Sequence, residues 1–205
     1  MPVRPVPPTP RLVLATVVVI AWWWLSACTA APGLPVPPAE TPPPSPFAAC
    51  PAVATSASSA PPSGDLPDVT LACFTGGETV SLRALVAGVG KPMVINLWAS
   101  YCGPCRAEMP AFQAFADELG DRVLVLGVDT ADGWSAGAWA GIGFGGHYPN
   151  LYDPDGAVLK ALGRNALPVS LFVAADGSVQ ATDVSGKLTL DKLHDLAAAN
   201  LGLSS

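Results

Sequence analysis

The chain has 205 residues, of which 13% are charged, and its formal net charge is −6. This length accommodates one domain of about 140 residues with extensions. The acidic balance excludes the basic surfaces typical of nucleic-acid-binding proteins, so we expect no nucleic-acid partner. The 23 prolines exceed the usual share of about 5%, and many precede residue 65. The composition therefore predicts that the folded part begins near that residue.

The first 28 residues have the features of a secretory signal. Arg4 and Arg11 give it a positive start, and an apolar core runs over Leu12–Leu25. This core is too short for a comfortable membrane span. Residues 25–28, LSAC, resemble the lipobox of bacterial lipoproteins, whose cysteine is lipidated and becomes the mature N-terminus. We therefore expect lipid at Cys28, with an ordinary cleaved signal or an uncleaved anchor as the alternatives.

Residues 29–64 consist mostly of Pro, Ala and Ser, with almost no charge and no hydrophobic periodicity. Such a segment is a semi-rigid linker, partly in the polyproline II conformation, and not part of a packed core. The sequence thus predicts three parts: a lipoprotein signal peptide at 1–28, a disordered linker at 29–64 and one domain at 65–205.

Within the domain, apolar runs, helical periodicity and turn residues predict alternating strands and helices. Strands are expected at Asp68–Ala72, Thr79–Leu82, Val94–Trp98, Arg122–Val128, Asn150–Tyr152, Val169–Ala174 and Ser178–Val184. Helices are expected at Gly103–Leu119, at Trp134–Ile142, after the turn at 153–156 as far as Leu162, and at Leu190–Leu201. Asp176-Gly177 is typical of the tight turn of a hairpin, which would join the last two strands.

Residues 93–110, MVINLWASYCGPCRAEMP, place a Cys-X-X-Cys pair between a buried strand and the longest helix. Cys102 is expected at the helix N-terminus, with Cys105 one turn further in and more buried. The free amides and the helix dipole favour an anion there, which lowers the pKa of a thiol. Two intervening residues let the pair close and reopen a disulfide. The sequence therefore predicts a redox-cycling dithiol in which Cys102 is the nucleophile and Cys105 resolves the mixed disulfide.

Other roles for such a pair have less support. A structural zinc site needs a second pair of ligands at short spacing, whereas Cys50 and Cys73 are far apart and His147 and His194 are isolated. We expect no metal, and we expect both histidines on the surface. A permanent structural bridge is disfavoured by the position of Cys102 at a helix start.

The motif carries a family resemblance. Trp98 and residues 102–105 match the W-x-x-x-C-G-P-C pattern of the thioredoxin superfamily, and the element order over Leu66–Leu203 is similar to the thioredoxin order. Residues 105–110, CRAEMP, resemble the C-R-x-E-x-P signature of TlpA/ResA-like exported thiol–disulfide oxidoreductases. Asn96 stands where thioredoxin has a buried Asp. The resemblance implies a thioredoxin-like α/β fold, in which helices flank a central mixed sheet that carries an extra N-terminal hairpin.

The resemblance also implies roles for residues around the pair. Glu108, one turn beyond Cys105, would shuttle protons to and from that thiol; a solvated position on the helix surface is the alternative. Pro168 would form a cis peptide bond that faces the motif and offers the backbone of the preceding residue to a bound peptide. The expected substrate-binding residues are Trp98, Tyr101, Leu167 and Pro168; the family usually has Trp at the Tyr101 position.

Two cysteines remain once the motif and the lipobox are assigned. In an exported protein, Cys50 and Cys73 are expected to form a structural disulfide. The alternative is that one of them is a further redox partner for Cys102, although neither lies in an activating Cys-X-X-Cys context.

The resemblance implies an enzyme anchored by lipid to the outer face of the cell membrane: a thiol–disulfide oxidoreductase with no cofactor beyond its own cysteine pair. Its partners would be protein thiols or disulfides and a membrane electron donor or acceptor. Relatives of this type mostly reduce disulfides during cytochrome c assembly or copper-site maturation, and an oxidant in oxidative folding is the alternative.

Two further classes stay open at this point. Paired thiolates favour Cu(I), so a copper chaperone is conceivable, but Met93 and Met109 are predicted in the core instead of beside the pair. A peroxiredoxin-like peroxidase needs a T-x-x-C motif, whereas Ser100-Tyr101 precede Cys102.

Overall fold

The computed structural model describes residues 44–52, 65–77 and 79–203. The signal peptide, Cys28 and linker residues 29–43 and 53–64 lie outside these ranges. The described strands are β1 (Thr70–Cys73), β2 (Thr79–Ser81), β3 (Met93–Trp98), β4 (Leu124–Thr130), β5 (Asn150–Asp153), β6 (Val169–Val173) and β7 (Val179–Asp183). The described helices are α2 (Leu82–Val89), α3 (Gly103–Leu119), α4 (Trp134–Phe144), α5 (Ala157–Ala161) and α6 (Leu190–Leu201).

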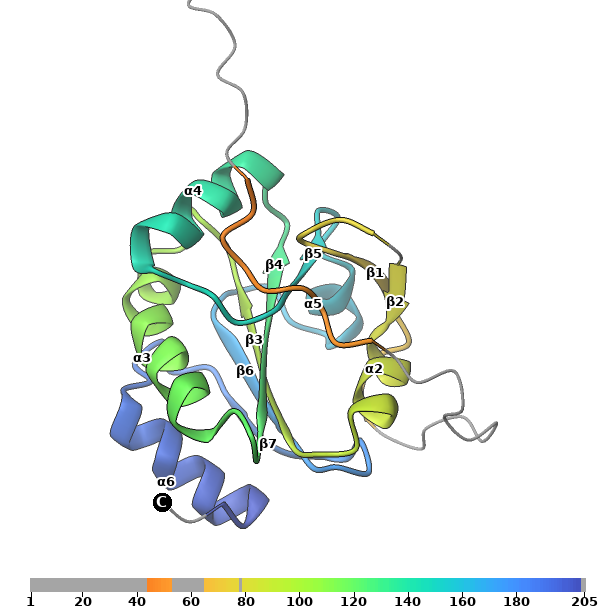
Figure 1. The fold of residues 1–205 in the computed structure, drawn as a ribbon, viewed down its shortest axis with the longest axis vertical. Coiled ribbons are helices and arrows are strands. Elements are labelled where there is room, and N and C mark those ends of the chain that lie inside the picture. The colour runs from red at the N-terminus through yellow and green to blue at the C-terminus, as the bar shows by residue number, and fades with distance from the viewer. Residues whose placement is uncertain (1–43, 53–64, 78, 204–205) are drawn as a thin grey trace, which may run out of the picture. The chain divides into compact units, whose positions relative to one another are not determined.

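The strands form one mixed sheet in the order β2-β1-β5-β4-β3-β6-β7. β4 runs parallel to both β3 and β5, and the other pairs are antiparallel. Helices α3, α4 and α6 cover one face, and α2 and α5 cover the other (Figure 1). β1 and β2 form the N-terminal hairpin. The expected thioredoxin-like architecture, a central mixed sheet with flanking helices and an extra hairpin, is therefore confirmed.

The central strand β3 separates two apolar cores. All six of its residues are buried, as expected for a strand covered on both faces. Val94 and Trp98 contribute to the core beneath α3 and α6. Ile95 and Leu97 alternate with them and contribute to the core beneath α2. The end of β3 is thus held rigidly on both sides, and it is from this end that the chain enters the cysteine motif.

Residues 44–50, here called the N-terminal strap, differ from the expected disordered linker. The strap crosses the domain in extended form (orange in Figure 1). Phe47 is buried, with its ring centroid 5.0 Å from that of Phe74 and 5.9 Å from that of Trp98. α4 admits the strap because residue 141 is glycine: a Cβ there would lie 2.6 Å from the Phe47 ring. The reason for the difference is tertiary packing, which the proline-rich composition does not reveal.

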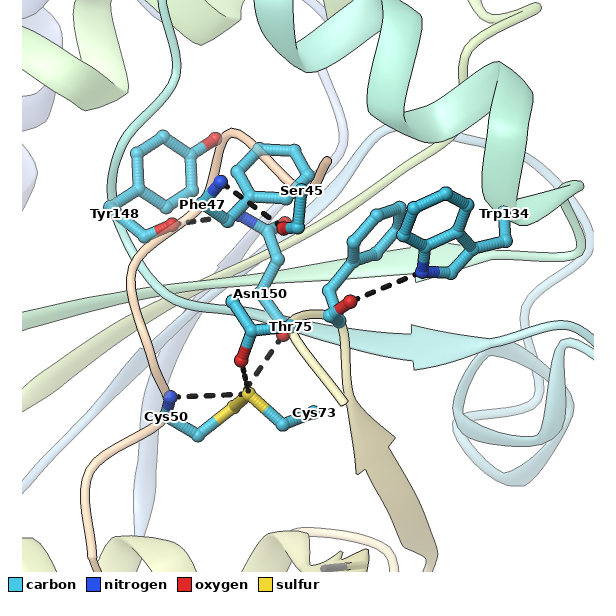
Figure 2. The surroundings of a disulfide bond; sticks show 9 residues. Ser45, Phe47, Cys50, Cys73, Thr75, Trp134, Tyr148 and Asn150 are labelled. Atoms are coloured by element: carbon cyan, nitrogen blue, oxygen red, sulfur yellow. Dashed lines mark hydrogen bonds between the residues drawn. A yellow bond between two sulfur atoms is a disulfide. The ribbon is translucent and has the colours of Figure 1, made fainter. Parts of the chain in front are cut away.

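The strap ends at a disulfide. Cys50 and Cys73 are bonded, with their Cα atoms 5.9 Å apart, and the Cys50 amide donates to the Cys73 sulfur at 3.1 Å (Figure 2). Cys73 is the last residue of β1 and is buried. The bond therefore fastens the strap to the β1–β2 hairpin.

His194 departs from the expected surface position. It lies on α6 with its ring centroid 5.2 Å from that of Phe115, and its Nε2 is 2.8 Å from Glu118 Oε2. The ring is half-buried because α6 packs against α3 at this point. His147 is exposed, as expected. None of the helices in the described ranges has the length and hydropathy needed to cross a lipid bilayer.

Candidate active site

The Cys102–Cys105 pair is a disulfide at the start of α3. The two Cα atoms are 5.3 Å apart, and the Cys102 sulfur accepts a hydrogen bond from the Cys105 amide at 3.2 Å. Cys102 is the N-cap of the helix, and Pro104 occupies the first turn, where its missing N–H costs nothing. Cys102 is 8% exposed and Cys105 is 0% exposed. An external thiol or disulfide can therefore approach Cys102 but not Cys105.

A second loop closes over the pair. The Leu167–Pro168 peptide bond is cis. Gly186, with φ +65°, packs against both prolines: a Cβ there would lie 3.2 Å from Pro104 and 3.5 Å from Pro168. Glycine at this position thus lets the Pro168 loop approach the motif loop, as the resemblance implied.

A groove of about 400 Å³ runs beside the exposed sulfur. Tyr101, which is 66% exposed, forms part of its wall. The groove is lined by Tyr101, Cys102, Gly103, Pro104, Leu159, Asn165, Ala166 and Leu167. It is mostly apolar and backbone-rich, which suits an extended peptide more than a small polar ligand.

Trp98 does not line this groove, which corrects its expected role in substrate binding. Its side chain is fully buried, and its indole N–H donates to Asn150 Oδ1 at 2.8 Å. The ring contacts Phe144 edge-to-face, with centroids 5.6 Å apart. Because β3 is covered on both faces, its last residue points into the core and supports the motif from below.

Glu108 is buried and not a solvated helix residue. It is 2% exposed, and its Oε1 accepts a hydrogen bond of 2.6 Å from the Leu188 amide. Burial raises the pKa of this carboxyl, the Leu188 hydrogen bond lowers it, and the negative charge of Asp183 raises it. The net direction is upward, so the group can hold a proton closer to neutral pH than an ordinary Glu.

Tyr148 lies in the same polar region, which the sequence did not indicate. Burial raises the pKa of its hydroxyl, the neighbouring Asn96 side chain lowers it, and the charge of Glu108 raises it. Within the described ranges, Glu108 Oε2 and the Asn96 amide are buried without a well-formed hydrogen bond. Asn96, Glu108 and Tyr148 therefore form one buried polar group.

The sequence did not indicate Asp129 or Asp132 as site residues either. Asp129, near the end of β4, is fully buried. Its pKa is raised to about 9, chiefly by burial and further by Asp132 and Asp153. Asp132 Oδ2 accepts a hydrogen bond of 2.5 Å from the Ser100 amide, two residues before Cys102. The only sequence signal was their place at the carboxyl end of a strand parallel to the motif strand.

Within the described part of the chain, no group of three or more His, Cys, Asp or Glu side chains is arranged to hold a metal ion.

Known structures share this fold. A Chlorobium tepidum protein that is described as a putative thiol:disulfide interchange protein DsbE superposes with a TM-score of 0.59 at 25% identity. The match covers 68% of this chain and 96% of that one. A secreted disulfide oxidoreductase of Mycobacterium tuberculosis superposes with a TM-score of 0.55 at 23% identity, covering 64% and 96% of the two chains. The second likeness shows the fold alone.

The chain also has relatives in sequence. The chain is 30% identical over 106 residues to the thiol-disulfide oxidoreductase ResA of Oceanobacillus iheyensis, covering 51% of this chain and 55% of that protein. It is 28% identical over 124 residues to the thiol:disulfide interchange protein DsbE of Tatumella citrea, covering 58% and 64%. The chain thus spans between half and two thirds of the length of these relatives. Residues 62–199 match the Redoxin family, and the chain belongs to that family.

Proposed function

We propose that this chain is a thiol–disulfide oxidoreductase that exchanges disulfides with protein substrates. The observation that carries the proposal is the Cys102–Cys105 disulfide at the start of α3, which has one approachable sulfur beside a peptide-sized groove. The relatives named ResA and DsbE support the same chemistry.

The exchange proceeds in two balanced steps. In the reducing direction, the Cys102 thiolate attacks one sulfur of a substrate disulfide, a mixed disulfide forms, and the other substrate sulfur leaves as a thiolate. The Cys105 thiolate then attacks the Cys102 sulfur and releases the second substrate thiolate. Two electrons pass to the substrate, and the enzyme becomes the disulfide form. The reverse sequence oxidises a substrate dithiol.

Glu108 assists the second step. The Cys105 thiol is buried and must lose its proton before it can attack. A carboxyl one turn along the helix, whose pKa is raised, accepts that proton and returns it when the disulfide reopens.

The groove supplies the binding site. Tyr101, Cys102 and Leu167 line the same groove, and the backbone of Leu167 is available to a peptide that binds there. The substrate is therefore an extended protein segment around a cysteine, and recognition rests on backbone and apolar contacts more than on charge.

We propose further that the protein acts outside the cytoplasm as a reductase of the cytochrome c or copper-site maturation type, tethered through lipid on Cys28 and fed by a membrane electron donor. The signal-like N-terminus and the C-R-x-E-x-P signature support this. Oxidation of folding proteins is the alternative direction.

One measurement tests the activity and its direction. The purified protein is equilibrated with glutathione buffers, and the reduced fraction of the Cys102–Cys105 couple gives its reduction potential. A potential well below that of glutathione supports the reductase, and a value above it supports the oxidant. Failure of the couple to open under any buffer contradicts exchange altogether. The lipid tether is tested separately by the intact mass of membrane-extracted protein; a mature chain that begins elsewhere than Cys28, without acyl mass, contradicts it.

A further inference from the structure

Two carboxyl groups lie beside the active-site turn. Asp129 pairs in parallel register with Trp98, so the end of β4 lies next to the end of the strand that leads to the cysteines. Asp132 follows on the loop between β4 and α4. Neither residue has a part in the exchange steps described above.

Asp129 is sealed from solvent. A Cβ on Gly137 of α4 would lie 2.2 Å from Asp129 Oδ2 and 3.1 Å from the Phe74 ring, so the helix backbone rests directly on the carboxyl. The Phe74 ring stacks on Trp134 with centroids 5.4 Å apart. An ionised carboxylate in such surroundings is strongly disfavoured unless it is paired.

The groups that face Asp129 do not provide a positive charge. They are the carboxyls of Asp132 from the loop and Asp153 from β5. Tyr152, the register partner of Asp129 on β5, is uncharged, and its hydroxyl donates to the Asp132 carbonyl at 3.2 Å. Both oxygens of the Asp129 side chain are buried, and no donor among the described residues reaches them. The Asp132 carboxyl is close enough to raise the pKa of Asp129, through its charge and as a potential hydrogen-bond partner. Two carboxylates contain no donor, so a hydrogen bond between Asp129 and Asp132 can form only while Asp129 carries a proton. The raised pKa of Asp129 agrees with a proton that is retained at neutral pH.

Asp132 connects Asp129 to the turn that holds the cysteine motif. Its Oδ2 accepts from the Ser100 amide, and its Oδ1 accepts from the Gly133 amide at 2.7 Å. Ser100 lies within the turn that is closed by the Cys102 amide donating to the Ala99 carbonyl at 3.1 Å. The carboxyl of Asp132 thus holds the turn that presents Cys102.

We propose that protonated Asp129 donates a hydrogen bond to Asp132 and that this pair positions the turn carrying Cys102, which is released when the proton is lost. While the proton is held, Asp132 is fixed between Asp129 and the Ser100 amide. When Asp129 ionises, two adjacent negative charges repel, and the half-buried Asp132 moves away and leaves Ser100 without its acceptor. Both aspartates are positioning residues, and their effect on exchange rests on the proposed function.

The first test needs no enzymatic activity and no variant. In the oxidised protein, where neither motif cysteine titrates, carbon-13 NMR follows the Asp129 carboxyl and nitrogen-15 NMR follows the Ser100 amide from about pH 5 to 10. We expect one shared transition near pH 9. An Asp129 that ionises in the ordinary acidic range overturns the proposal, and so does a Ser100 resonance that does not move with it.

The second test measures the consequence for the disulfide. A phosphine reductant is used because it needs no thiolate and stays unprotonated at alkaline pH. In the wild type, we expect the rate of disulfide reduction to fall about three- to tenfold as Asp129 ionises, the effect of one lost hydrogen bond. Asp129→Asn cannot ionise and keeps a donor for Asp132, so its rate should stay level over the same range.

Asp155→Asn is the matched control. It removes one nearby exposed negative charge without touching the pair, and it should retain the wild-type fall. A fall of equal size in Asp129→Asn overturns the proposal. If the phosphine and NMR results agree with the pair but no protein substrate is ever exchanged, the proposed function fails and the carboxyl pair stands.

Discussion

The two disulfides of this domain are the same bond in opposite settings. Cys102–Cys105 spans 3 positions at a helix start and has one sulfur next to a groove. Cys50–Cys73 spans 23 positions and joins the strap to β1. On the loop-entropy relation, the long loop stabilises by about 3 kcal/mol and the short one by about 2 kcal/mol. The surroundings of each disulfide, and not the strength of its bond, therefore suit Cys102–Cys105 to exchange and Cys50–Cys73 to stabilising the fold.

The largest effect is expected when the sulfur of Cys102, the one that a substrate can approach, is removed. We expect Cys102→Ser to abolish disulfide exchange with a protein substrate, because the remaining sulfur is fully buried. Cys105→Ser should instead accumulate mixed disulfides, which lack the resolving thiol. Insulin reduction and non-reducing electrophoresis measure the two outcomes. Faster alkylation of Cys105 than of Cys102 in the reduced wild type would contradict the assignment.

The stabilising side of the comparison depends on the strap as well as on its disulfide. Phe47→Ala should lower the free energy of unfolding by about 3–5 kcal/mol, because its ring fills the space between Phe74, Trp98 and Phe144. Urea unfolding measures this change. Ile142→Ala is the control, since that side chain is exposed on α4 and should cost far less. Equal losses in the two variants would show that the strap is not part of the core.

Removal of both Cys50 and Cys73 sharpens the contrast with the motif pair. The double alanine variant should lose about 3 kcal/mol of unfolding free energy from the lost loop closure, with exchange preserved. Differential alkylation of the wild type should show Cys102 and Cys105 opening first under mild reductant. Free Cys50 and Cys73 thiols in native protein would rule out the structural bond.

The smallest effect is expected from substitution of Glu108, a neighbour of the motif pair in sequence that the structural disulfide lacks. Since its pKa is raised by burial, Glu108 ionises at a higher pH than its usual value of 4.5. The wild-type resolving step should therefore accelerate as pH rises through that raised value. Glu108→Gln should lack this rise and be slower above the raised value by about a hundredfold, the lower end of what general acid–base catalysis contributes.

The raised pKa of Glu108 also makes the free energy of unfolding depend on pH. The folded state binds the Glu108 proton more tightly than the unfolded state, so wild-type stability falls as pH rises from the usual value towards the raised one. Glu108→Gln should not show that fall. Stopped-flow exchange and urea unfolding between about pH 4 and 9 give both profiles; superimposable profiles would mean that Glu108 is only a structural residue.

Local signals predicted the helices best. The bounds of α3 and α6 agree with expectation, because Pro104 marks the first turn of one and Gly202, in the left-handed conformation, ends the other. The expected strand Arg122–Val128 is observed at Leu124–Thr130. Its last two residues are polar yet buried, because β5 and α4 cover them, and hydrophobic pattern alone ends the strand too early.

The site was predictable where chemistry is local in sequence. Cys102, Cys105 and Glu108 lie within seven residues, so spacing brings them together before any tertiary contact forms. Tyr148 and Asp129 reach the same region from distant strands and loops, and only the parallel register of β4 beside β3 places Asp129 there. Trp98 shows the opposite case, since motif membership predicted contact with substrate where strand burial directs the ring inward.

The added hairpin has a consequence for self-association. Without it, β5 would present a row of unpaired backbone groups at the sheet edge, a template for pairing with another chain. β1 covers that edge, and the strand now outermost is β2, which has only three residues. So short an edge offers little for a second molecule to extend. Because Cys73 ends β1, the disulfide that fastens the strap also guards the sheet against aggregation, so its reduction should be followed by slow oligomerisation before any loss of redox chemistry.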